Sequence, residues 1–72
     1  MAPRLRISME GNEIAIDGNK EGLMFLSSLC QNLASLTKEQ AQTPANHYHI
    51  SDKFGNAVEG SIPAILGYIP DL

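Results

Sequence analysis

The sequence predicts an α+β fold, a two-layer ββαββ domain in which one helix packs on a four-stranded, mostly antiparallel sheet. Three observations predict it. Two short segments near the start of the chain alternate apolar and polar residues, a longer segment repeats leucines at helical spacing, and two apolar segments near the end again have strand character. The 72 residues suffice for a single small domain, which we expect to span residues 1–72.

The first two strands are expected over residues 4–10 and 13–17. A Gly-Asn pair separates them and suits a two-residue hairpin turn, which places Arg6 opposite Asp17. In this register the large apolar residues of both strands share one face, namely Leu5, Ile7, Met9, Ile14 and Ile16. The agreement between turn and pattern favours the hairpin.

A helix is expected over residues 20–36. Asn19 is a suitable N-cap, and Glu21 lies in the first turn, where its charge suits the helix dipole. One apolar stripe follows at steps of three and four residues: Leu23, Leu26, Leu29, Cys30, Leu33 and Leu36. Cys30 is expected to be a buried apolar residue of this stripe. Residues 37–46 contain no large apolar side chain and predict an exposed loop.

The last two strands are expected over residues 47–51 and 61–68. A tight turn at the intervening Gly-Asn pair would place the two apolar sets on opposite faces. We therefore expect a longer loop over residues 52–60, or a bulge near Gly60. Pro63 has no N–H for the ladder, which indicates an edge strand or an outward-facing donor position.

One face of the expected sheet has no helix to cover it. By strand alternation it carries Arg4, Arg6, Glu13, Asp17, His47, His49 and Ile65. This face is either an ordinary solvated sheet face or a surface that recognises a protein partner, with charged groups and imidazoles around an apolar anchor. The spacing of the two histidines also occurs in metal sites, but no third ligand is fixed near them, so no metal or cofactor is predicted.

Composition excludes several classes of function. The net charge is −3 and the five basic residues are scattered, so nucleic-acid binding is not expected. The longest apolar run, residues 62–70, is about half of the ~20 residues of a membrane span, and the first residues lack a secretory signal. We expect a cytoplasmic protein that binds neither nucleic acid nor membrane. With no catalytic motif and one cysteine, we also expect no enzyme.

Three short motifs carry a resemblance to a known family. A Gly-Asn-Lys-Glu-Gly-Leu segment opens the helix at Gly18, a His-Tyr-His-Ile strand begins at His47, and a Glu-Gly-Ser-Ile segment from Glu59 opens the last strand. In this order they resemble family thirty-two of the bacterial polymorphic-toxin immunity proteins, over about residues 14–66. The sequence departs from the family pattern at Pro63 and Gly67. The resemblance implies a non-catalytic protein that binds and blocks a toxin domain.

Two other functions remain open at this point. The chain could be a homodimeric structural or accessory protein that covers its own sheet face, because so small a domain gains stability from oligomerisation. Alternatively, it could be a small metal-binding protein that uses the two histidines.

Overall fold

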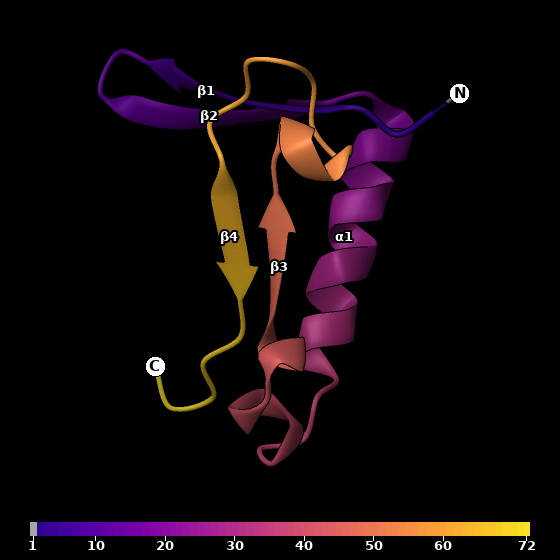
Figure 1. The fold of residues 1–72 in the computed structure, drawn as a ribbon, viewed down its shortest axis with the longest axis vertical. Helices are drawn as coiled ribbons and strands as arrows, with labels where there is room; N and C mark the ends of the chain where they lie inside the picture. Colours follow the sequence, from indigo (N-terminus) through magenta and orange to yellow (C-terminus); the bar gives the residue numbers. More distant parts are fainter. Residues whose placement is uncertain (1) are drawn as a thin grey trace.

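The computed structural model describes residues 2–72 and has the α+β composition that the sequence predicts (Figure 1). Its elements are the strands β1 (Leu5–Glu10) and β2 (Glu13–Gly18), the helix α1 (Lys20–Ala34), and the strands β3 (His47–Ile50) and β4 (Ala64–Gly67). Short 3₁₀ turns occur at Gln40–Gln42, Pro44–Asn46 and Asp52–Phe54. No helix within residues 2–72 combines the length and apolar character needed to cross a membrane.

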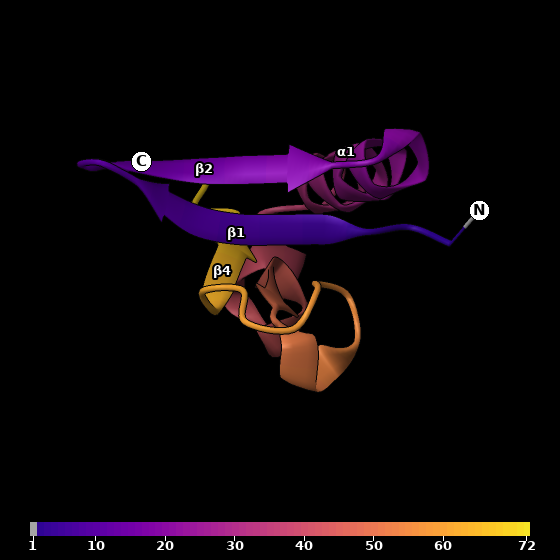
Figure 2. The same ribbon diagram turned by 90° about the horizontal axis from the view of Figure 1, so that it is seen from above.

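The predicted single four-stranded sheet is wrong. β1 pairs only with β2, and β3 pairs only with β4, so the four strands form two separate two-stranded antiparallel sheets. Figure 1 shows the β1–β2 hairpin lying crosswise over one end of β3, β4 and α1. Seen from above in Figure 2, β1 passes over the β3–β4 side and β2 lies towards α1.

The outer edge of β1 explains why the strands do not join. Val58 donates its backbone N–H to the Leu5 carbonyl at 2.7 Å, and Ile62 donates to the Ile7 carbonyl at 2.8 Å. The Ile7 N–H donates to the hydroxyl of buried Ser61 at 3.3 Å. An irregular segment therefore occupies the edge where a third strand would pair, and the chain turns away from β1 only after it.

The hairpin has the predicted register. Arg6 pairs with Asp17, and all the apolar pairs fall on the same face. Gly11 has a φ of 63° and is the only residue of the two-residue turn with positive φ. Gly at the first central position with positive φ is the pattern of a type II′ turn, which matches the twist of the flanking strands.

The β3–β4 pair places histidines and apolar residues on opposite faces. Tyr48 pairs with Leu66 and Ile50 with Ala64 on the face that packs on the core. His47 pairs with Gly67 and His49 with Ile65 on the other face. The connection is the long loop that the sequence predicts rather than a tight turn. β4 is shorter than the expected span of residues 61–68, because residues 61–62 bond to β1.

The core lies between α1, the inner face of β3–β4 and the first half of the hairpin. Its buried apolar residues are Leu5, Ile7, Leu29, Leu33, Ala41 and Ile50. Ala41 belongs to a segment expected to be an exposed loop, which instead forms two 3₁₀ turns and closes one end of the core.

The apolar stripe of α1 is only partly covered. Leu29 and Leu33 are buried, but Leu23 is 49% exposed and Cys30 is exposed. The prediction that Cys30 is buried is wrong, because two narrow sheets leave one flank of the helix open. The helix also ends at Ala34, with Ser35 as its C-cap, two residues before the expected end.

The first turn of α1 is tied to the chain before β1. The Asn19 side-chain oxygen accepts from the N–H of Gly22 at 2.7 Å and from the N–H of Arg4 at 3.1 Å. The Asn19 amide nitrogen donates to the Ala2 carbonyl at 3.0 Å, and its backbone N–H donates to the Arg4 carbonyl. Asn19 is thus both the predicted N-cap and the link between the helix and β1.

Replacing Asn19 with alanine is expected to lower the free energy of unfolding by about 1–2 kcal/mol, because the helix loses its cap. Urea denaturation monitored by circular dichroism measures the change. Asn32→Ala, on the exposed side of the same helix, is the matched control and should change stability by less than about 0.5 kcal/mol. Equal losses in the two variants would contradict the assigned role of Asn19.

Gly22 should not tolerate a side chain, although glycine in a helix is normally about 1 kcal/mol worse than alanine. A Cβ atom there would overlap the Arg4 carbonyl oxygen and lie 2.7 Å from the Arg4 carbonyl carbon. Gly22→Ala is therefore expected to destabilise the protein by about 1–3 kcal/mol. In the control Gly67→Ala, the new methyl group comes no closer than 3.7 Å to another group. Thermal unfolding measures the effect. A Gly22→Ala variant that unfolds at a higher temperature than the wild type would contradict the close packing.

Candidate functional site

The residues predicted to form one open sheet face lie on two different sheets. Arg6, Glu13 and Asp17 belong to the outer face of the β1–β2 hairpin, whereas His47, His49 and Ile65 belong to the outer face of β3–β4. Because the hairpin crosses the other sheet, these two faces are not continuous (Figure 1). The prediction of a single polar platform is therefore wrong, and each face must be considered by itself.

Arg4 precedes β1, and its backbone is held by Asn19. Its side chain is exposed beside a shallow pocket of about 290 Å³ that Arg6, Asp17 and Val58 also line.

The outer face of the hairpin is a solvated surface with weak charge pairing. The Arg6 guanidinium lies 3.4 Å from the Asp17 carboxylate, but the side chains are 63% and 55% exposed. An ion pair this exposed contributes little, because water screens it and both side chains lose freedom. Glu10 stands directly opposite Glu13 at the turn. Nothing in this arrangement concentrates binding energy.

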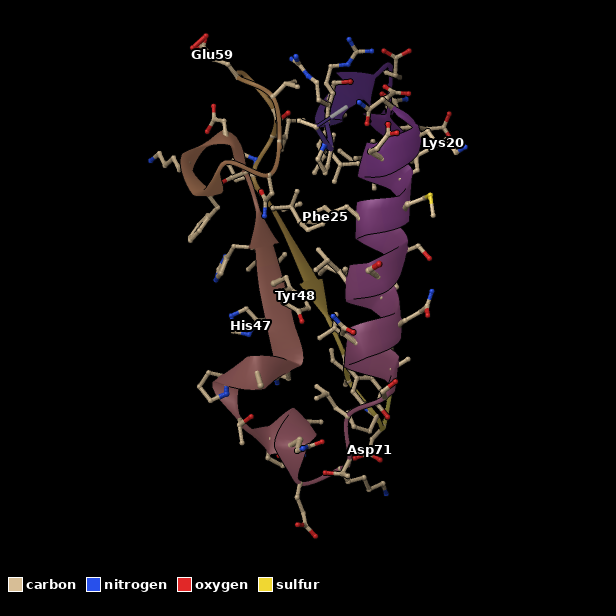
Figure 3. All side chains as sticks on the ribbon, turned by 90° about the vertical axis from the view of Figure 1, so that its right-hand side faces the viewer. Lys20, Phe25, His47, Tyr48, Glu59 and Asp71 are labelled. Atoms are coloured by element: carbon tan, nitrogen blue, oxygen red, sulfur yellow. The ribbon has the colours of Figure 1, made fainter. Side chains whose placement is uncertain are left out.

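The outer face of β3–β4 carries a row of contacting rings. The imidazoles of His47 and His49 meet edge to face, with centroids 4.9 Å apart. The His49 ring stacks on the Phe54 ring at 5.4 Å, with only 14° between their planes. Figure 3 shows His47 on the side of β3 away from α1, whereas Tyr48 and Phe25 lie between β3 and the helix. We call the surface formed by His47, His49, Phe54 and Ile65 the ring face.

Phe54 was not among the residues singled out from the sequence. It follows β3 in the 3₁₀ turn Asp52–Phe54 and is 66% exposed. The only signal available in the sequence was a single phenylalanine between Lys53 and Gly55 in a polar loop. That pattern does not reveal that the turn folds the ring back over a histidine of the preceding strand.

The side chain of Asn56 holds this turn against β3. Its oxygen accepts the N–H of Ser51 at 2.8 Å, and its amide nitrogen donates to the carbonyl of His49 at 2.9 Å. Gly55, with a φ of 74°, allows the tight reversal between Phe54 and Asn56. The Asn56 side chain thereby satisfies backbone groups at the outer edge of β3, and it keeps Phe54 over His49.

A shallow pocket of about 520 Å³ opens beside the stacked rings. It is lined by His49, Ser51, Lys53, Phe54, Pro63, Ala64 and Ile65. Ile65 is 67% exposed at its rim. Apart from the lysine and histidine side chains, the pocket offers mainly hydrocarbon, so it suits an apolar side chain from another protein better than a polar small molecule.

The geometry does not assemble a catalytic or metal-binding set around the histidines. The His47 Nδ1 atom lies 2.9 Å from the side-chain oxygen of Asn46, its neighbour in sequence. Within residues 2–72 no group of three or more His, Cys, Asp or Glu side chains is placed to hold a metal ion. Cys30 lies on α1, whereas both imidazoles lie on the face of β3–β4 that points away from this helix, so the three side chains do not form a cysteine–histidine pair.

Comparison with known families gives one match. The model of the family described as Immunity protein 32 matches residues 13–69, which include β2, α1, β3 and β4. Neither the curated proteins nor the solved structures contain a match. Because the family match covers most of the 72 residues and all three motifs noted in the sequence, the chain belongs to the Immunity protein 32 family.

Proposed function

We propose that this protein is a non-catalytic immunity protein that binds a bacterial toxin domain and blocks it, with the ring face as its main contact surface. Family membership supports the immunity role. It acts in the cytoplasm of the cell that makes the toxin, where a newly made toxin must be neutralised. Inhibition of this kind needs only a complementary surface, and it requires no cofactor.

The exposed stack of Phe54 on His49 is the observation that carries the choice of surface. Aromatic side chains supply large contact areas at low entropic cost, and they are enriched in the few residues that dominate binding energy. Phe54 is 66% exposed and lines the same pocket as Ile65, which is 67% exposed, so the two form an apolar patch of the kind that marks interaction sites. The ring face is therefore favoured over the charged face of the hairpin.

The pocket beside the rings indicates how the partner docks. Ile65 and Phe54 stand on two sides of it, and Lys53 provides a positive charge at its rim. We infer that an apolar side chain of the toxin enters the pocket, with an acidic or carbonyl group close to Lys53. His47 extends the contact along β3, since its ring touches that of His49. The hairpin residues Arg6, Glu13 and Asp17, with Arg4, then take part only at the periphery.

The probe for this test is a toxin domain taken from any gene found adjacent to that of this protein. Phe54→Ala is expected to weaken its binding by at least about tenfold, as for a central contact residue. Isothermal titration calorimetry measures the affinity, and survival of cells expressing the toxin measures protection. Met24→Ala removes a side chain of similar exposure, 62%, from α1 and should leave both unchanged. Unchanged affinity of Phe54→Ala would exclude the ring face as the main contact surface. A wild-type protein that does not bind the toxin would exclude that toxin as its partner.

Asn56→Ala tests whether the turn must be held in place. It leaves the Ser51 N–H without its partner, which should reduce the free energy of unfolding by about 1–2 kcal/mol. It should also weaken toxin binding, because Phe54 loses its position over His49. The chemical shifts of the His49 ring protons, recorded by nuclear magnetic resonance at a temperature where the variant is folded, would report the lost stacking. Full binding by a variant that has lost the stacking would contradict the role given to the rings.

A further inference from the structure

β4 presents a strand edge that no part of the described chain covers. The Tyr68 N–H donates to the Asn46 carbonyl, so alternation along the ladder makes Tyr48–Leu66 and Ile50–Ala64 the hydrogen-bonded pairs. The N–H and carbonyl groups of Ile65 and Gly67 therefore point outward. Within residues 2–72 no backbone partner faces them, and both residues are exposed.

The neighbouring edges are protected in other ways. Residues 58–62 cover the first half of β1, and the Asn56 side chain pairs the edge of β3. Protein strands that must stay unpaired usually carry charged residues along the exposed edge. β4 lacks this protection, because residues 60–70 contain no charged side chain.

The shape of the β4 edge complements itself. Ile65 projects from the outer face, and two residues later Gly67 has no side chain. A pocket of about 320 Å³ lies over Gly67 and is lined by Asn46, His47, Ile65, Tyr68 and Ile69. If two β4 strands pair antiparallel about Leu66, each Ile65 lies directly opposite the other copy's Gly67. The projecting side chain of one copy then enters the pocket of the other.

We propose that a second copy of this chain docks on the β4 edge and forms a continuous four-stranded antiparallel sheet in the order β3–β4–β4–β3. Ile65 and Gly67 of each copy exchange N–H···O bonds with Gly67 and Ile65 of the other, which makes four bonds around the twofold axis. This interaction goes beyond toxin binding. It uses Ile65 and the pocket beside His47, which border the ring face, and it leaves His49, Phe54 and Lys53 to the toxin. A two-stranded sheet is only marginally stable, so the pairing also stabilises each subunit.

The open edges of β4 and β2 differ in charge. The outer edge of β2, at Ile14 and Ile16, also has no partner strand. Glu13 and Asp17 flank these residues, so two copies joined there would bring four carboxylates together. The uncharged β4 edge imposes no such repulsion between chains that each carry a net charge of −3.

The twofold axis that relates the two β4 strands also brings a second apolar segment close to the exposed part of the hairpin. Figure 1 shows that the hairpin tip extends past β4 on the side of its free edge, while the end of the described chain lies on that side at the other end of the sheet. A twofold axis at Leu66 brings residues 69–72 of the second copy towards the hairpin tip that extends past β4. There Met9, Ile14 and Ile16, each more than half exposed, can pack on Ile69 and Leu72.

Sedimentation velocity of the full chain over a range of concentrations tests the proposal, with a dimer as the expected result. Ile65→Lys and Gly67→Lys place a charge at the interface and should raise the dimer dissociation constant roughly 100-fold. Both sites are exposed, and Gly67 has space for a Cβ atom, so the monomer should still fold. Met24→Lys adds the same charge on α1 and should dimerise like the wild type.

Amide hydrogen exchange identifies the edge directly. The amides of Ile65 and Gly67 should become protected as the protein concentration rises, while those of Ile14 and Ile16 stay unprotected. A chain that is monomeric at every concentration would overturn the proposal, as would a dimer that both lysine variants retain. Protection of Ile65 and Gly67 that appears only after toxin is added would also overturn it, and would assign the edge to a toxin strand.

Discussion

The pairing of residues 58–62 with the edge of β1 is the constraint on which the rest of the structure depends. The carbonyls of Leu5 and Ile7 accept from Val58 and Ile62, so no regular strand can add to the hairpin on that side. The chain leaves this edge after Ile62, which makes the last backbone hydrogen bond to β1. β4 is then free to run crosswise to the hairpin with β3 as its partner. Both the ring face and the open β4 edge result from this change of direction.

Two small sheets cover less apolar surface than one large sheet would. Six apolar residues of the described chain are buried, while Met9, Ile14 and Ile16 remain more than half exposed under the far half of the hairpin. An apolar pocket of about 130 Å³, bordered by Ile16, Leu26, Cys30 and Leu66 among others, opens on the same flank. A domain of this size buries only a modest fraction of its surface. Association with other chains is thus a natural source of additional stability.

The two candidate faces differ in the physics of recognition. On the hairpin, Arg6 and Asp17 form an exposed ion pair, which water weakens and which any approaching partner must desolvate. On the ring face, His49 and Phe54 are already stacked, and Asn56 restrains the turn that carries Phe54. A preorganised apolar surface loses little freedom on binding. This difference is the reason we propose the ring face, rather than the hairpin, as the surface that binds a toxin.

The sequence by itself determined the local structure and the family. Strand alternation and the Gly-Asn turn predicted the register of β1 with β2, and Asn19 was identified as the helix cap, because both depend on contacts within a few residues. The alternation of β3 also placed His47 and His49 away from the helix. Only the tertiary structure decided that the strands form two sheets and that Phe54 covers His49. Those features depend on hydrogen bonds and ring contacts between separate segments of the chain, such as the bonds of Ile7 with Ser61 and Ile62. Hydrophobic periodicity describes each segment alone and does not predict which segments will meet.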